Sequence, residues 1–521
     1  MIIKSRLLQD TLITSVENYS DHIALISGDV RMSYREVTDY ACRLAHALRM
    51  QGVRRGDRVA IFMDNTWQCA VSIYGILLAG GVFVPINLQT KQDKLAFILQ
   101  DADAHVLLSE LLLSRVFSPV VQLLPTLQVF CPKNSMDLSV NMGNVFDNLV
   151  DMPTTPPPQS AVSQDLAALI YTSGTTGEPK GVMHTHQSLN FVLDSINEYL
   201  GFSQDERLFS ALPLNFGYGL FQWLSAVRIG ATLILERSFT YPAQVFKRIQ
   251  DEAVTSFAGV PTVFAMMLAL DAKQALHFPS VRRLTNAAAA LPIEFIPGIL
   301  RMFPEASIYK MYGQTECIRC AYLNPALAEL KPDSVGCAIP GTELLLLDDN
   351  GGTVAKGEVG NLYVRGPHLM KGYWKQPEKT AEVLVPGLVQ GELMLKSGDL
   401  FRQDTDGDFF FVARSDEMIK SRGEKVSPVE VENAIYCLPA VQEVLVIGLP
   451  DTLLGEAVVA FVAAREGQKL SVQQIKHICT DRLENFMVPK HVFFLSELPR
   501  TANGKLSRKL IMEQFDQYLP N

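Results

Sequence analysis

The sequence predicts an α/β protein, with a large N-terminal domain of stacked β-sheets and helices and a small C-terminal α+β domain. The chain has 521 residues, which is more than one hydrophobic core of ordinary size can hold. Helical apolar stripes alternate with short strands through its first half, an order typical of parallel sheets covered by helices. Beyond about residue 415 the elements become shorter. We therefore expect domains at 1–414 and 415–521.

Helix and strand patterns follow one another along the chain. Apolar residues on one helical face, from Val37 to Leu48, precede a predicted strand at 59–63. The same order returns at 93–108 and again at 242–259. Prolines among polar residues at 151–160 favour an extended connector. The C-terminal part is expected to contain strands at 444–448 and 458–463 and helices at 429–437 and 472–483.

Composition excludes several classes of protein. The net charge of -9 disfavours nucleic-acid binding, because neutralising phosphates requires a basic surface. Eight scattered cysteines are too few for a disulfide scaffold and indicate a reducing compartment. The first 22 residues lack an apolar run of signal-peptide length, so we expect a cytoplasmic protein. Residues 70–88 approach the length of a membrane span, but Gly80, Gly81 and Pro85 interrupt them, which favours a core helix, turn and strand.

The segment 171–186, YTSGTTGEPKGVMHTH, joins a predicted buried strand at 166–171 to a helix expected from Ser188 onward. Its glycines allow positive φ, and its hydroxyls and lysine are donors for an anion. A Walker loop is excluded, because glycine follows Lys180 where that loop needs serine or threonine. A flexible surface loop is the alternative. We predict a polyphosphate cradle formed by Thr172, Ser173, Gly174, Thr175, Thr176, Gly177, Lys180 and Gly181.

Three further motifs follow in order: MYGQTE at 311–316, a segment at 397–432 that begins SGDLF, and LPRTANGKLSRK at 498–509. With the cradle, they resemble the acyl-adenylate-forming superfamily of acyl-CoA synthetases, peptide-synthetase adenylation domains and beetle luciferases. The resemblance covers nearly the whole chain and is closest to bacterial acyl-CoA synthetases and acyl-carrier-protein ligases. It implies that a carboxylic acid is activated by ATP with Mg²⁺, that pyrophosphate is released, and that the acyl group passes to a thiol.

The resemblance assigns the phosphate contacts. The cradle and Lys180 would hold the β- and γ-phosphates, with Thr172 as a catalytic residue. Glu316 would be a catalytic residue and the Mg²⁺ ligand, since this hard cation prefers carboxylate and phosphate oxygens. Thr315 would contact the α-phosphate.

The resemblance also assigns the nucleoside contacts. Tyr312, next to Gly313, would stack on adenine. Asp399 would accept hydrogen bonds from both ribose hydroxyls, which suits a carboxylate with two oxygens. Arg414 would be a further ribose or phosphate contact. The alternatives are a buried tyrosine, a capping aspartate and a surface salt bridge.

Lys505 is the predicted catalytic lysine, which in the family bridges the substrate carboxylate and the α-phosphate. It lies in the small domain, so adenylation would require that mobile domain to close over the large one. For the thiol step the resemblance implies rotation about a hinge at Asp416. Gly423 would then line the pantetheine tunnel. The basic residues near the thioester step would be Lys420, Lys425 and Arg422, the last as a contact for CoA phosphate or, alternatively, part of a solvated basic loop.

The acyl pocket is expected around LPLNFGYGLFQW at 212–223. Amino-acid-activating relatives carry an aspartate here for the substrate ammonium, but Gly217 takes that place and no carboxylate lies between residues 208 and 235. An amino acid would bury an unpaired ammonium, so we expect a hydrophobic, fatty or related carboxylic acid instead. The expected walls of the pocket are Phe216, Tyr218, Gly259, Ala287, Ala288, Ala289, Ala290 and Gly313. The four alanines could instead pack a helix against the sheet.

The expected acceptor is the thiol of coenzyme A. The alternatives are the phosphopantetheine arm of an acyl or peptidyl carrier protein and, more remotely, a non-catalytic adenylate-binding protein. The last is disfavoured because the catalytic groups named above are all present.

Two positions depart from the family pattern. Ala413 replaces a common glycine, and Lys310 stands where relatives often carry an amide that contacts adenine. Cys317 and Cys320 form a C-x-x-C pair without a second pair for zinc, so we predict two buried thiols. His184 and His186 could also bind a metal, but we expect them to begin a helix instead.

Overall fold

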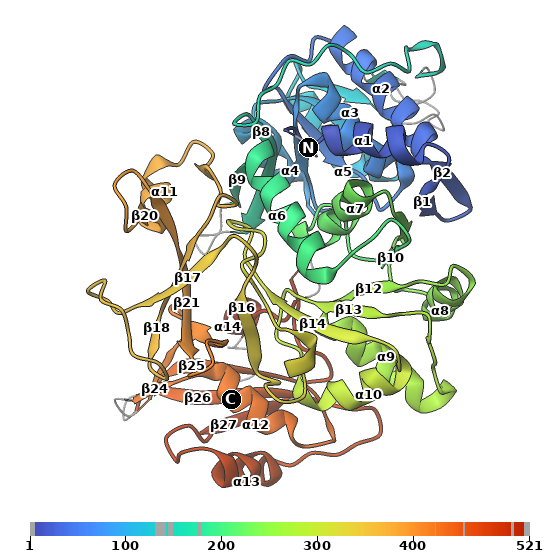
Figure 1. Cartoon of the computed structure of the whole chain (residues 1–521). Helices are drawn as coiled ribbons and strands as arrows, with labels where there is room; N and C mark the ends of the chain where they lie inside the picture. Colours follow the sequence, from blue (N-terminus) through green and yellow to red (C-terminus); the bar gives the residue numbers. More distant parts are fainter. Residues whose placement is uncertain are drawn as a thin grey trace.

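The computed structural model describes residues 6–130, 142–143, 149–173, 179–421, 424–451, 454–501 and 505–514. These residues form three sheets with helices packed on them, as the predicted α/β class requires. In Figure 1 the blue N-terminal elements occupy the upper part of the view, and the C-terminal helices α12 (Pro428–Tyr436) and α13 (Val472–Arg482) lie at the bottom.

One N-terminal sheet is parallel at its centre. β3 pairs in parallel with β4 and with β5, and a helix precedes each of these strands, so the predicted alternation is confirmed. β8 and β9 form an antiparallel hairpin at the other side. The strands in spatial order are β19 (Gly372–Tyr373), β9 (Pro179–Thr185), β8 (Leu166–Ser173), β4 (Val82–Pro85), β3 (Arg58–Phe62), β5 (Ala104–Ser109), β6 (Gln128–Phe130) and β7 (Met142–Gly143).

The larger sheet is parallel in one half and antiparallel in the other. Its parallel half ends at β14, and antiparallel strands continue from there. β20 (Leu384–Pro386) pairs with β21. The spatial order is β17 (Glu343–Leu347), β18 (Val359–Arg365), β21 (Leu393–Gln403), β22 (Phe409–Arg414), β16 (Ser334–Ala338), β15 (Ala321–Tyr322), β14 (Ser307–Tyr312), β13 (Arg283–Asn286), β12 (Ser256–Gly259), β10 (Arg207–Ser210), β11 (Thr232–Leu235), β1 (Ile23–Ser27) and β2 (Val30–Ser33).

Helices cover these sheets and fill the space between them. The largest core joins α2, α3, α6 and α7, and the fully buried Trp223 lies in it. Its indole Nε1 donates to the Ala70 carbonyl at 3.0 Å. The N-terminal helices are α1 (Asp10–Tyr19), α2 (Tyr34–Met50), α3 (Trp67–Ala79), α4 (Gln92–Asp101), α5 (Ser114–Leu123), α6 (His186–Leu200), α7 (Gly217–Ile229), α8 (Pro242–Asp251), α9 (Pro261–Gln274), α10 (Ile296–Met302) and α11 (Pro377–Val383).

The apolar segment 70–88 is a core helix, turn and strand, as predicted. α3 ends at Ala79, and Gly80 follows it with a left-handed φ of 90°. β4 then runs from Val82 to Pro85 and is buried throughout. Among the described residues, no helix is both long enough and apolar enough to cross a bilayer.

The C-terminal part forms a small α+β unit, as predicted. The large sheet's β22 ends at Arg414, and the first strand of the small sheet begins at Ile419. The small sheet contains β24 (Glu424–Val426), β23 (Ile419–Ser421), β26 (Gly455–Ala464), β25 (Val441–Asp451) and β27 (His491–Phe494). Its helices are α12 (Pro428–Tyr436), α13 (Val472–Arg482) and α14 (Arg508–Gln514).

One expectation about the glycine-rich segment is wrong. The loop expected up to Ser188 is shorter, because residues Pro179–Thr185 form strand β9 and α6 already begins at His186. β9 is held by β8 on one edge and by β19 on the other. Gly181 is part of this strand and does not have positive φ. Its small size instead admits the close approach of the Leu169, Tyr171 and Trp374 side chains.

Two glycines at the start of α7 provide a matched test of the packing. A Cβ on Gly219 would lie 2.3 Å from the Pro213 carbonyl oxygen, whereas a Cβ on Gly217 would meet no atom within 4 Å. We expect Gly219→Ala to lower the free energy of unfolding by about 2 kcal/mol, because backbone must shift. Gly217→Ala should change it by less than about 0.5 kcal/mol. Urea midpoints of the two variants measure this, and equal midpoints would contradict the packing described here.

Candidate active site

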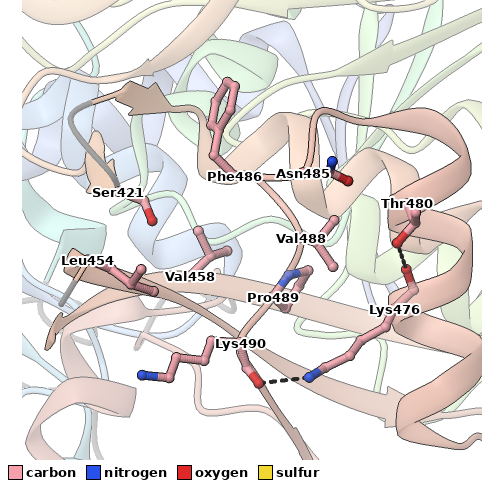
Figure 2. A pocket seen from close by; sticks show the side chains of 10 residues that line it. All are labelled: Ser421, Leu454, Val458, Lys476, Thr480, Asn485, Phe486, Val488, Pro489 and Lys490. Carbon is pink, nitrogen blue, oxygen red and sulfur yellow. Dashed lines mark hydrogen bonds between the residues drawn. The ribbon is translucent and has the colours of Figure 1, made fainter.

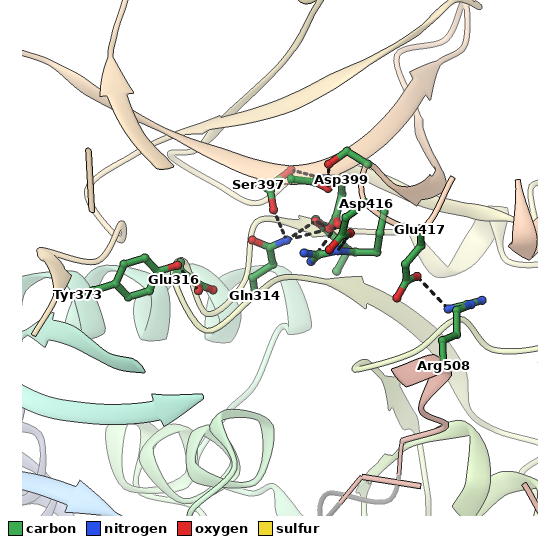
Figure 3. A network of polar contacts seen from close by, with 12 residues as sticks. Gln314, Glu316, Tyr373, Ser397, Asp399, Asp416, Glu417 and Arg508 are labelled. Atoms are coloured by element: carbon green, nitrogen blue, oxygen red, sulfur yellow. Dashed lines mark hydrogen bonds and ion pairs between the residues drawn. The ribbon is translucent and has the colours of Figure 1, made fainter. Parts of the chain in front are cut away.

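A buried carboxylate, Asp399, lies where the YGQTE segment meets β21 (Figure 3). The Tyr312 hydroxyl donates to Asp399 Oδ2, and Gln314 Nε2 donates to the same oxygen at 2.8 Å. Gln314 also reaches the Ser397 carbonyl at 2.8 Å. Tyr312 and Gln314 therefore fix the position of the Asp399 carboxylate. Gln314 belongs to the MYGQTE motif but had no predicted role.

The second oxygen of Asp399 remains available to a ligand. Oδ1 lies 3.2 Å from an Arg414 guanidinium nitrogen but receives no hydrogen bond from the described residues. Burial raises the pKa of Asp399, while the Arg414 charge and the bonds from Tyr312 and Gln314 lower it. The two residues predicted to contact ribose, Asp399 and Arg414, thus lie together. Oδ1 of Asp399 can still accept a hydrogen bond from a sugar hydroxyl.

The predicted adenine partner Tyr312 is held at one edge and partly exposed. It ends β14 and packs edge-to-face on Phe401, with ring centroids 4.9 Å apart. Gly313 follows it, and a Cβ there would lie 2.4 Å from the Ile318 carbonyl oxygen. The protein's own backbone therefore occupies the space beside Gly313.

Tyr373, which sequence analysis did not identify, contacts both a predicted phosphate-binding residue and the predicted Mg²⁺ ligand. Its hydroxyl donates to Glu316 Oε1 at 2.8 Å, and the Lys180 ammonium lies 5.1 Å from its ring centroid. Thr172 and Lys180 are paired residues of β8 and β9. Lys180, Thr172 and Glu316 are thus brought into one region. Tyr373 lies in β19, more than fifty residues beyond Glu316, and no spacing in the sequence indicates the contact.

Several predicted phosphate and thiol-step residues lie outside the described part of the chain. These are Gly174, Thr175, Thr176 and Gly177 of the cradle, together with Arg422 and Gly423; of Ser173 only the strand position is described.

A buried histidine supports the loop that carries Thr315. His184 Nε2 donates to the Thr315 carbonyl at 2.7 Å. Burial lowers the pKa of His184 to about 4, so the ring is neutral near pH 7. His186 begins α6, as predicted, whereas His184 lies in β9, so the expectation that it begins a helix is wrong. No group of three metal-ligating side chains occurs within the described ranges.

Two aromatic residues predicted to line the acyl pocket, Phe216 and Tyr218, lie close together. Tyr218 is buried in α7, and its hydroxyl lies 2.6 Å from Thr285 Oγ1. Phe216 and Ala288 pack against a cluster that contains Tyr218 and Ala287. Open space adjoins Gly217, where a Cβ would meet nothing within 4 Å. Gly259 instead faces the Phe264 ring, which a Cβ would approach to 2.7 Å.

The small domain reaches this side through Lys505. Its ammonium lies 5.4 Å from the centroid of the Phe216 ring. Burial lowers the pKa of Lys505, and the positive charge of Arg319 lowers it further. The predicted catalytic lysine therefore lies beside Phe216, a predicted wall of the acyl pocket, in an environment that disfavours an unpaired cation.

Charged pairs surround the predicted hinge. Arg414 Nε lies 3.4 Å from Asp416 Oδ1, and the Ser415 N–H donates to the Gly398 carbonyl at 2.9 Å. Glu417 pairs at 3.1 Å with Arg508 of α14, as Figure 3 shows. Lys420, on β23, is exposed and its N–H donates to Glu456 at 2.6 Å.

A separate cavity of about 460 Å³ lies within the small domain (Figure 2). Leu454, Val458 and Phe486 give it apolar walls, and the Lys476 ammonium reaches the Lys490 carbonyl at 2.9 Å. It contains none of the predicted site residues, although Ser421, which directly precedes Arg422 and Gly423, is part of its wall.

Cys317 and Cys320 are both buried and free, as predicted. Lys310, in β14, is also buried, and its ammonium donates to the Pro332 carbonyl. Burial lowers the pKa of Lys310 to about 8. Ala413 is buried in β22.

The chain matches two protein families in succession. The first, described as AMP-binding enzyme, covers residues 12–374, and the second, AMP-binding enzyme C-terminal domain, covers residues 430–505. A long-chain-fatty-acid–CoA ligase of Bacillus subtilis (strain 168) is 31% identical to the chain over 541 residues, which cover 98% of this chain and 95% of that protein.

Solved structures are similar over nearly the whole chain. The anthranilate CoA ligase AuaEII, in complex with anthranoyl-AMP, has a TM-score of 0.90 and 29% identity, and 99% of each chain is covered. An O-succinylbenzoate coenzyme A synthetase of Bacillus subtilis, in complex with ATP and magnesium ion, has a TM-score of 0.83 and 26% identity, covering 96% of this chain and 99% of the other.

The buried histidines predict a loss of stability in mild acid. Burial lowers the pKa of His184, His186 and His368 to about 4, whereas unfolding returns each to its ordinary value of 6.5. The unfolded chain therefore binds more protons below pH 6.5. Stability is complete above that pH and falls as pH decreases toward 4, by about 2 kcal/mol per histidine between pH 6.5 and 5.

His368→Gln isolates one of these contributions. We expect urea midpoints of this variant to fall less between pH 6.5 and 5 than those of the unsubstituted protein. His477→Gln is the control, because His477 is exposed on α13. The same pH slope in His368→Gln and the unsubstituted protein would contradict the assignment.

Proposed function

The chain belongs to the AMP-binding enzyme family, and we propose that it joins a largely apolar carboxylic acid to coenzyme A. The resemblance carried by its four motifs is thereby confirmed, and with it an AMP-forming acid–thiol ligase activity that uses ATP and Mg²⁺. The identity of the acid and the roles of individual residues are the proposed part.

One observation carries the proposal: Lys505 of the small domain lies against Phe216 of the acyl site. A cation placed where its charge is poorly solvated favours binding of an anion. The carboxylate of the acid and the α-phosphate of ATP are the two anions that adenylation must bring together. Lys505 can contact both, because its ammonium is a compact charge on a long stem.

The large domain supplies the nucleotide contacts. Asp399 accepts hydrogen bonds from ribose through Oδ1, which receives none from the described residues, and the partly exposed Tyr312 stacks on adenine. Glu316 has one oxygen bonded to Tyr373, and its other oxygen fits a Mg²⁺ ion that is otherwise held by phosphate oxygens. Mg²⁺ there would neutralise phosphate charge as pyrophosphate leaves. Lys180 and Thr172 contact the outer phosphates.

We assign the domains to residues 1–414 and 415–521, with Asp416 at the hinge. β22 of the large sheet ends at Arg414, and the Arg414–Asp416 and Glu417–Arg508 pairs lie on either side of this point. After adenylation, rotation here would withdraw Lys505 and present the face with Lys420 to the adenylate for the thiol step.

Lys505→Ala tests the central assignment. We expect acid-dependent pyrophosphate release to fall about 100-fold or more, because the charge that stabilises the transition state is lost. Lys509→Ala is the matched control on the same segment, since Lys509 is exposed on α14. Unchanged release in Lys505→Ala, with the protein folded, would refute the proposal.

The acceptor can be identified by a second measurement. Pyrophosphate release with fatty, aryl, short branched and amino acids is measured with CoA, a phosphopantetheinylated carrier protein or hydroxylamine as acceptor. We expect CoA to accelerate turnover with one class of acid and amino acids to be inactive. Product with hydroxylamine but no effect of CoA would instead identify a carrier protein as the acceptor.

A further inference from the structure

A second cation, Arg319, is buried at the proposed acyl site and has no carboxylate counter-ion among the described residues. Only 4% of its surface is exposed. Its guanidinium carbon lies 5.3 Å from the Tyr218 ring centroid. Nε has no hydrogen-bond partner, and the guanidinium forms no ion pair with a carboxylate, within the described ranges of the chain. Arginine is always charged, so this charge cannot be removed by loss of a proton.

The local backbone fixes the position of Arg319. Its N–H donates to the Cys317 carbonyl at 2.6 Å, and Ile318 between them has a φ of 59°. A β-branched residue adopts this conformation at a cost, so the surrounding structure must impose it. Gly313 does so in part, because the backbone of Ile318 and Arg319 fills the space where its side chain would be.

Arg319 adjoins the residues that line the acyl site. Tyr218 lies under its guanidinium. Burial raises the pKa of Tyr199, whereas the charge of Arg319 and a side-chain hydrogen bond from it lower that pKa. Tyr199 in turn stacks on Tyr322, with ring centroids 4.2 Å apart. The cation thus lies within an aromatic wall, and Lys505 is near enough for its pKa to be lowered by Arg319.

Contact with Tyr218 does not by itself account for this arrangement. The attraction of a cation to a tyrosine face is smaller than the cost of removing a charge from water. The guanidinium also leaves Nε unpaired, which adds to the cost. A carboxylate is the group that offsets both, since it accepts two parallel hydrogen bonds from a guanidinium.

We propose that Arg319 binds a second carboxylate of the acid substrate, so that the enzyme activates a dicarboxylic acid with an apolar body. The inference rests on the proposed ligase function and specifies its substrate. The reacting carboxylate meets Lys505, and the second meets Arg319, so two substrate charges balance two cations. The aromatic wall and the open space at Gly217 accept the apolar body between them.

The test compares matched acids in the pyrophosphate-release assay with ATP and CoA. The pairs are dicarboxylic acids of three to ten carbons against monocarboxylic acids of the same length, and terephthalate against 4-methylbenzoate. Monoamides of the diacids are included as neutral acceptors. We expect at least one dicarboxylic acid to exceed its monocarboxylic partner about 30-fold or more in kcat/KM.

Substitution of Arg319 connects this preference to the residue. Arg319→Met should reduce the dicarboxylate-to-monocarboxylate ratio about 30-fold or more, and Arg319→Lys should retain part of it. Arg115→Met, an exposed position on α5, is the matched control and should leave the ratio unchanged. The ratio is read only for variants whose thermal unfolding shows that they are folded.

Three results would overturn the inference, and they are distinguishable. A preference for the monocarboxylic acid in every pair refutes it while leaving the ligase function intact, and this comparison needs no variant. A preference for the monoamides shows that the site takes a neutral acceptor instead. An unchanged dicarboxylate-to-monocarboxylate ratio in folded Arg319→Met would show that Arg319 does not recognise the second carboxylate. Absence of turnover with every acid would refute the proposed function itself.

Discussion

The contact between the Lys505 ammonium and the Phe216 ring completes the site, because it joins a cation of the small domain to the acyl wall of the large one. Burial and the charge of Arg319 both lower the pKa of this lysine, so positive charge is held there at a cost. Anions relieve that cost when they bind. The charge of Lys505 therefore links two properties: the stability of the arrangement in which this lysine lies against Phe216, and the affinity for carboxylate and phosphate.

The negative charges of the candidate site belong to Asp399 and Glu316, and tyrosine hydroxyls keep these carboxylates in place. Tyr312 donates to Asp399, and Tyr373 donates to Glu316. Each tyrosine bonds one carboxylate oxygen, and the other oxygen can serve ribose or Mg²⁺. A carboxylate that paired with Lys505 would neutralise the cation that the reacting carboxylate needs.

The sequence predicted the alternating helices and strands, because apolar periodicity indicates which face of a helix or strand is buried. It missed β9 because Pro179 and Gly181 lower strand propensity locally, and the pairing with β19 that supports this strand comes from almost two hundred residues away. The motifs located Lys505, Glu316 and Asp399. Tyr373 and Arg319 lie outside those motifs, and their roles depend on long-range contacts that spacing does not encode.

Arg319 and Lys505 differ in one respect that bears on the order of the two half-reactions. Lys505 belongs to the small domain and would leave the acyl site in the proposed rotation, whereas Arg319 follows β14 of the large sheet and stays. Adenylation masks the reacting carboxylate, so the charge that Lys505 binds there is consumed before the rotation. A second carboxylate would keep its charge throughout. A fixed arginine can therefore hold the acyl group in place while the thiol replaces the lysine at its other end.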